Sequence, residues 1–158
     1  IVLATAAFAA SPTLRASAMN LLVETFEDHT GFRLVYTPPT ENASDDGLNF
    51  TVNWIPEGYE LESHRENRFS ARCVYSSDNC QELSIGLFEG ENTGLCLDTE
   101  NAEVHDEMIN GKKAVIITKE GVSQLCLIDE KKGNYLLITG SMEQTDDLVK
   151  IAQNIQFE

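Results

Sequence analysis

The chain has 158 residues, a length that suits one globular domain able to fold without a metal or a disulfide. Its 26 aspartates and glutamates outnumber its 11 lysines and arginines, so the net charge at pH 7 is −15. Such a surface repels nucleic-acid phosphates and anionic lipid headgroups. We therefore expect no nucleic-acid partner and no domain lying on a membrane face, and the simplest interpretation of the charge is a solubilising surface.

The first ten residues are uncharged and mostly apolar, and the sequence does not begin with methionine. Two interpretations stay open. Ala7-Phe8-Ala9 fits the small-x-small pattern of a signal-peptidase site, which would make the protein secreted or lipoprotein-like. Alternatively, residues 1–10 are the outer end of a transmembrane helix, which needs about 20 apolar residues to span the bilayer. Both predict an extracytoplasmic domain, and we favour a membrane anchor that ends near residue 10.

The next segment predicts a helix that follows the anchor directly. Ser11-Pro12 is typical of a helix start, and Gly31 is a suitable stop. An apolar stripe recurs between them at helical spacing: Leu14, Ala18, Leu21, Leu22 and Phe26. We predict an amphipathic juxtamembrane helix from Ser11 to about Asp28. Its stripe needs a cover, and a second copy of the chain is one candidate, so a homodimer is expected. Residues 1–30 then form the membrane-proximal part and residues 31–158 the extracytoplasmic domain.

Most of residues 31–158 have the pattern of β-strands separated by turns. The predicted strands span residues 32–36, 50–54, 59–65, 69–75, 81–88, 103–109, 113–119, 124–129 and 134–139, with a short one at 95–97. A polar connection with two prolines, residues 37–47, follows the first strand. Asn110-Gly111 is a strong hairpin signal. The apolar runs 114–117 and 135–138 predict central strands that are covered on both faces.

The chain ends in a predicted helix that supplies one of those covers. Thr145 is its expected N-cap, and Asp146 and Asp147 stand in the first turn, where the helix dipole favours anions. One helical face is apolar: Leu148, Ile151, Ala152 and Ile155. The predicted fold class is α+β, a twisted antiparallel meander sheet with an N-terminal juxtamembrane helix and a C-terminal packing helix.

The four cysteines allow two disulfides in three pairings and match no zinc-binding pattern. A four-residue turn at 76–79 would place Cys73 opposite Glu82, which leaves Cys73 and Cys80 too far apart for an easy bridge. Cys96 and Cys126 each lie between leucines, as buried thiols often do. We predict free thiols, with one disulfide as the alternative.

No group of residues in the sequence specifies a reaction. His29, His64 and His105 have no histidine or cysteine partner at metal-ligand spacing. The sequence contains neither the Gly-x-Ser-x-Gly elbow nor a glycine-rich phosphate loop. We therefore predict no catalytic residues, no cofactor and no metal site, and expect that the protein is not an enzyme.

Two sets of residues are candidates for an interaction surface. One is an aromatic strip, for which packing in the core is the alternative: Trp54, Tyr59, Phe69 and Tyr75. The other is an acidic set, which does not match the closely spaced calcium loop and has a solvated face as its alternative: Asp98, Glu100, Glu103, Asp106 and Glu107.

Four segments carry a resemblance to a known family. They are Trp54-Ile55-Pro56-Glu57-Gly58-Tyr59-Glu60-Leu61, Ile109-Asn110-Gly111-Lys112-Lys113-Ala114, the ending Ile151-Ala152-Gln153-Asn154-Ile155, and Arg15-Ala16-Ser17-Ala18-Met19-Asn20-Leu21-Leu22-Val23-Glu24-Thr25-Phe26-Glu27. The chain resembles a bacterial domain of unknown function found on the outer side of single-span membrane proteins, many of them labelled anti-sigma-factor-like. The resemblance covers most of the chain and implies no catalytic residues.

Together with the apolar start, the resemblance implies a non-catalytic extracytoplasmic sensor or interaction domain of a membrane-anchored, anti-sigma-factor-like regulator. Its partner would be a sigma factor, held by a region upstream of Ile1, or a component of the cell envelope. The alternatives are a secreted or lipoprotein-like ligand-binding module and, less favoured, an envelope enzyme whose site is assembled only by folding.

Overall fold

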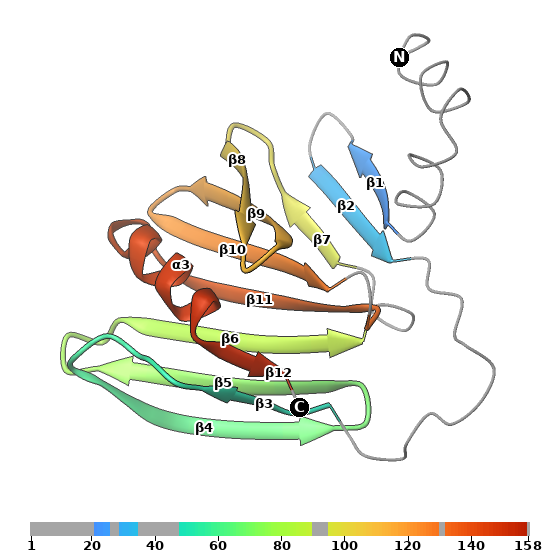
Figure 1. Cartoon of the computed structure of the whole chain (residues 1–158). Helices are drawn as coiled ribbons and strands as arrows, with labels where there is room; N and C mark the ends of the chain where they lie inside the picture. Colours follow the sequence, from blue (N-terminus) through green and yellow to red (C-terminus); the bar gives the residue numbers. More distant parts are fainter. Residues whose placement is uncertain (1–20, 26–28, 35–47, 90–94, 130–131, 158) are drawn as a thin grey trace, which may run out of the picture.

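The computed structural model describes residues 21–25, 29–34, 48–89, 95–129 and 132–157 (Figure 1). Within them the elements are β1 (Leu21–Thr25), β2 (His29–Leu34), β3 (Phe50–Val52), β4 (Tyr59–Asn67), β5 (Ser70–Ser77), β6 (Glu82–Glu89), β7 (Leu95–Asp98), β8 (Glu103–Ile109), β9 (Lys112–Lys119), β10 (Val122–Asp129), β11 (Asn134–Ser141), the 3-10 turn η1 (Met142–Gln144), α3 (Thr145–Gln153) and β12 (Ile155–Phe157). The predicted α+β class, an antiparallel sheet with a C-terminal helix, is confirmed.

The main sheet has seven strands in the order β4-β5-β6-β11-β10-β9-β8, and every neighbouring pair is antiparallel. The sequence predicts one continuous meander. The sheet instead consists of two meanders, β4 to β6 and β8 to β11, joined where β11 pairs with β6. Two smaller sheets accompany it, β1-β2-β7 and β12-β3. The long-range pairing of β6 with β11 brings together residues about fifty positions apart, such as Gly86 and Leu137.

Two-residue turns connect β8 to β9 and β9 to β10 in the second meander. Asn110 and Gly111 have φ values of 52° and 75°, and Glu120 and Gly121 have 49° and 82°. Turns with φ above zero at both central residues match the twist of a hairpin, and asparagine and glycine adopt such values most easily. The predicted hairpin at Asn110-Gly111 is thus confirmed.

The main sheet is covered on both faces, by a different element on each. Helix α3 lies across one face (Figure 1), and its Leu148 and Ile151 belong to the same buried cluster as Leu83, Ile85 and Leu136. On the other face, a second cluster packs around the short strand β7: Leu97, Ile117, Cys126, Ile128 and Tyr135. The two-sided burial predicted for runs 114–117 and 135–138 is confirmed, and β7 is the cover that the sequence did not predict.

The predicted N-terminal helix is wrong over Leu21–Thr25, which form strand β1. These residues pair in register with β2, with Leu21 opposite Leu34 and Val23 opposite Phe32. An apolar run with a β-branched valine and threonine suits a strand as well as a helix, and pairing with β2 decides between them. The rest of the helix, residues 11–20 and 26–28, lies outside the described residues.

This strand also changes the expectations attached to the helix. Leu21 and Leu22, part of the stripe that predicted a homodimer, are not helical. Strand β2 runs through the predicted domain boundary between residues 30 and 31. Among the described residues, no helix combines the length and the apolar character needed to cross a membrane.

Helix α3 begins without the predicted threonine cap. Gln144 occupies the N-cap position and makes no side-chain capping bond, while Thr145 is already helical. The Thr145 hydroxyl is 2.7 Å from the hydroxyl of buried Ser123 in β10, so it ties the helix to the sheet instead. Asp146 and Asp147 stand in the first turn, as predicted.

The buried Gln144 side chain links α3 to both meanders. Its Nε2 donates to the Tyr59 hydroxyl at 2.6 Å, and its Oε1 accepts from the Ser141 backbone N–H at 3.0 Å and from the Ser141 hydroxyl at 3.1 Å. The Tyr59 hydroxyl donates in turn to Gln81 at 3.2 Å. One amide therefore holds β4, β11 and the helix start in a fixed relation.

Replacing Gln144 by alanine is expected to lower the free energy of unfolding by roughly 1–3 kcal/mol, because buried polar groups lose their partners. Urea denaturation followed by circular dichroism measures this. Gln153→Ala, at an exposed position of the same helix, is the matched control and is expected to change stability by less than about 0.5 kcal/mol. Equal stability of the two variants would contradict the role of the Gln144 side chain in linking β4, β11 and the start of α3.

The cysteine geometry differs from the predicted turn. Cys80 has a φ of 59° and its backbone N–H donates to Ser77 at 2.9 Å, so it belongs to the turn itself. Cys73 consequently lies opposite Ile85 and not opposite Glu82. Cys73, Cys80 and Cys126 are free thiols, and the side chain of Cys96 lies outside the description.

Candidate functional site

Three of the four predicted aromatic residues lie against the helix-side core, whereas Phe69 is exposed. Trp54, Tyr59 and Tyr75 all pack on the buried cluster that includes α3. The Lys150 ammonium of α3 lies 3.8 Å from the centroid of the Trp54 ring, within the range of a cation–π contact. The Tyr59 hydroxyl is engaged by Gln144. These contacts give each ring a packing role, the alternative that the sequence left open.

Tyr75 neighbours a half-buried thiol. Burial raises the pKa of the Tyr75 hydroxyl, and adjacent Cys73 raises it further. Burial likewise raises the pKa of the Cys73 thiol, against a smaller lowering by its hydrogen bond to Tyr75. Both groups are therefore kept in their neutral forms near pH 7, which suits packing and not nucleophilic attack.

The predicted acidic set is divided among different parts of the fold. Asp98, at the end of β7, pairs with Lys119 at 2.6 Å, and it also accepts the Glu100 backbone N–H at 3.1 Å. The hydrogen bond to Asp98 raises the pKa of Lys119. Within β8, side chains alternate between the two faces, so Glu103 and Glu107 point to one face and Asp106 to the other.

In the described part of the chain, the structure brings together no metal-binding group. There, no set of three or more histidine, cysteine, aspartate or glutamate side chains is placed to hold a metal ion. His64 lies in β4 and His105 in β8, the two outer strands of the seven-stranded sheet. His105 is 3.0 Å from Glu103 and both side chains are exposed.

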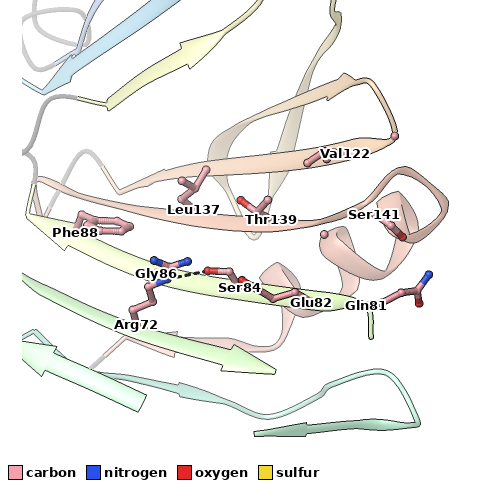
Figure 2. Close-up of a pocket in the computed structure, with 12 residues that line it drawn as sticks. Arg72, Gln81, Glu82, Ser84, Gly86, Phe88, Val122, Leu137, Thr139 and Ser141 are labelled. Atoms are coloured by element: carbon pink, nitrogen blue, oxygen red, sulfur yellow. Dashed lines mark hydrogen bonds between the residues drawn. The ribbon is translucent and has the colours of Figure 1, made fainter. Parts of the chain in front are cut away.

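A groove lies on the face of the main sheet opposite α3, and we call it the open-face groove. Its volume is about 480 Å³, a size typical of small-molecule sites. Residues of β5, β6, β10, β11 and their turns line it (Figure 2): Arg72, Gln81, Glu82, Ser84, Gly86, Phe88, Gly121, Val122, Leu137, Thr139, Gly140 and Ser141. Strand β7 packs on the neighbouring part of this face through the cluster that includes Phe88 and Leu137.

The alternation of β6 separates the groove from the core. Leu83, Ile85 and Leu87 are fully buried on the helix side. The residues between them, Ser84 and Gly86, face the groove. A strand whose odd positions are large and apolar and whose even positions are small or polar therefore builds a core on one face and leaves a hollow on the other.

One row of residues in register crosses the middle of the groove. Arg72 in β5 lies opposite Gly86 in β6, and Gly86 lies opposite Leu137 in β11. The Phe88 ring leans over Gly86, where a Cβ atom would lie 2.5 Å from its Cε2. The same ring stacks on Tyr135 with centroids 5.2 Å apart. The row thus has a guanidinium at one end and an apolar wall at the other.

The Arg72 side chain is held within the groove by a hydroxyl. Its Nε donates to the Ser84 Oγ at 3.0 Å (Figure 2). This bond orients the guanidinium and leaves its terminal Nη groups for a ligand. Thr139 lies opposite Ser84 in register, so a second hydroxyl stands on the floor beside the first.

The sequence analysis did not identify this site. Its residues come from four strands, and only the pairing of β6 with β11 brings Gly86 beside Leu137. The sequence did contain one sign of the groove. In residues 82–88, Ser84 and Gly86 alternate with large apolar residues, so one face of the strand has small side chains.

Comparison with known proteins gives one match. The model of a family described as a domain of unknown function, DUF4367, matches residues 49–155, which include β3 to β11 and α3. No curated protein and no solved structure matches the chain.

Proposed function

This chain belongs to the DUF4367 family of domains of unknown function, and from that premise we propose that it is the extracytoplasmic sensor domain of a membrane-anchored, anti-sigma-factor-like regulator. In this proposal the domain is non-catalytic and binds its ligand or protein partner in the open-face groove. The groove, a hollow of about 480 Å³ with mixed apolar and polar lining, is the observation that supports a binding role.

The connections around the groove suggest how binding would be transmitted. Phe88 and Leu137 line the groove and also pack in the cluster under β7. Strand β7 pairs with β2, and β2 pairs with β1, the first described element of the chain. A ligand that favours one arrangement of β7 on the main sheet would therefore shift the small sheet and the membrane-proximal segment before it. The sigma factor, bound by a cytoplasmic region upstream of Ile1, would be the final partner.

The proposal is tested in the full-length regulator. A pull-down from solubilised membranes with mass spectrometry identifies the partner, and the transcripts that this partner controls then report regulation. Deletion of residues 31–158 is expected to abolish the response to the signal. Thr139→Trp, which fills the groove, is expected to do the same, whereas Thr51→Trp, at the exposed position of β3, should respond like the wild type.

The outcomes separate two parts of the proposal. Unchanged regulation after deletion of residues 31–158 would refute the sensor role. Regulation that is lost by the deletion but normal in Thr139→Trp would keep the sensor role and remove the groove as its binding site.

A secreted or lipoprotein-like binding module is the second candidate, and the Ala7-Phe8-Ala9 pattern favours it. It predicts export with cleavage near Ala9, so that the mature protein begins near Ala10. Intact-mass measurement of the protein recovered from cells decides between this candidate and an uncleaved chain in the membrane fraction. Recovery of envelope components without a sigma factor would also support it.

A further inference from the structure

Arg72, at one edge of the open-face groove, belongs to an unusual pairing of positive charges. Arg65 of β4 is the register partner of Arg72 of β5, so two guanidinium side chains lie next to each other on adjacent strands. Among the residues that the structure describes, neither arginine is within ion-pair distance of a carboxylate, although Glu62 and Glu82 line a second, smaller hollow together with both arginines. Like charges directly opposite each other destabilise a sheet, and a bound anion relieves that repulsion.

The space beside Arg72 limits which chemical group can be attached to the anionic group of the ligand. From Arg72 to Leu137 the row spans two strand spacings, about 10 Å between Cα atoms. The Phe88 ring over Gly86 closes the row on one side. One ligand can therefore place a carboxylate on the guanidinium and an apolar group against Phe88 and Leu137 at the same time.

The floor toward the other end of the groove is polar. Ser84 and Thr139 form the next row in register, and Glu82 and Ser141 line the groove beyond it. From Gly86 to Glu82 is four strand residues, or about 13 Å. This length holds about three or four residues of an extended chain, with hydroxyls beneath its peptide groups. A simple acyl chain would offer no polar partner to the Thr139 hydroxyl.

We propose that the open-face groove binds the free C-terminus of an extended peptide that ends in an apolar residue. The terminal carboxylate contacts the Arg72 guanidinium, the last side chain packs against Phe88 and Leu137, and the preceding residues lie over Ser84 and Thr139. This inference rests on the proposed binding function of the groove and specifies the chemistry of its ligand.

The test uses the tetrapeptide acetyl-Gly-Ala-Gly-Leu with a free carboxylate, its C-terminal amide, and octanoate as probes. Each is titrated into the ¹⁵N-labelled chain, and the shifts of backbone amide signals are followed by NMR. The free acid is expected to shift groove signals such as Gly86 and Thr139 and to bind roughly 10- to 100-fold more tightly than the amide, because a charged hydrogen bond is lost in the amide.

Two variants locate the carboxylate. Arg72→Gln is expected to weaken the free acid by the same roughly 10- to 100-fold and leave the amide unchanged. Arg68→Gln removes the same charge at an exposed position beside Phe69, outside the groove, and should bind like the wild type. The dispersion of the backbone N–H signals in the ¹⁵N spectrum of each protein variant also shows whether that variant is folded.

Equal affinity for acid and amide would overturn the proposal, as would undiminished binding by folded Arg72→Gln. Binding of octanoate without binding of the peptide would overturn it in favour of an acyl ligand. If no probe binds while Thr139→Trp still blocks the cellular response, the ligand chemistry is wrong and the sensor function stands. If Thr139→Trp also responds normally, the groove itself is not the binding site.

Discussion

Replacing Ile151 by alanine is expected to lower the free energy of unfolding by about 2–5 kcal/mol. Ile151 is completely buried, and it lies in the cluster through which α3 covers the main sheet. Truncation removes apolar contacts from both the helix and the strands beneath it, and a cavity remains because a packed sheet cannot collapse around it. Since domains of this size are stable by only about 5–15 kcal/mol, the variant should be close to its unfolding limit.

Urea denaturation with far-ultraviolet circular dichroism measures the loss. Gln153→Ala is the control on the same helix, because Gln153 is exposed and alanine maintains helix propensity. A loss below about 1 kcal/mol for Ile151→Ala would mean that α3 is not docked as described.

Alkaline conditions are expected to destabilise the chain through Cys126. This thiol is completely buried under β7, and burial raises its pKa to about 12, from an ordinary value of 9.0. Between pH 9 and pH 12 the unfolded chain releases this proton while the folded chain retains it. Stability therefore falls as pH rises in that window, by about 1.4 kcal/mol per pH unit, and is unaffected by this group below pH 9.

The measurement compares urea midpoints of the wild type and Cys126→Ala from about pH 7 to pH 10.5. By the same slope, the difference in stability between them should narrow by about 2 kcal/mol across the alkaline part of this range. Thiol labelling at pH 8 gives an independent check, since exposed Cys80 should react at once and Cys126 only on unfolding. Parallel pH profiles of the two proteins would contradict a buried, protonated thiol.

The second meander was the part of the fold that the sequence predicted best. Two of its turns have φ above zero at both central residues, and Asn110, Gly111 and Gly121 are residues suited to such values. A strand covered on one face needs an apolar residue only at every second position. The runs at 114–117 and 135–138 are apolar at every position, which predicted that both faces are buried. These features are local, and local chemistry specifies them.

The errors arose where distant residues decide the outcome. Leu21 to Thr25 fit a helical stripe, but pairing with β2 makes them a strand. Thr145 has the right chemistry for a cap, but Ser123 in β10 engages its hydroxyl. The groove was missed for the same reason, because Arg72, Gly86 and Leu137 become neighbours only through strand register.

The small ribbon of β3 and β12 has a consequence for how this domain can be joined to other segments of chain. Phe50 lies opposite Phe157 and Val52 opposite Ile155, so the first and last strands of the segment from β3 to β12 are hydrogen-bonded neighbours (Figure 1). A module whose two ends leave side by side can be spliced into a surface loop or repeated in tandem without stretching its host. Because of this ribbon, other domains can be joined to the two ends of the segment without any change in the groove.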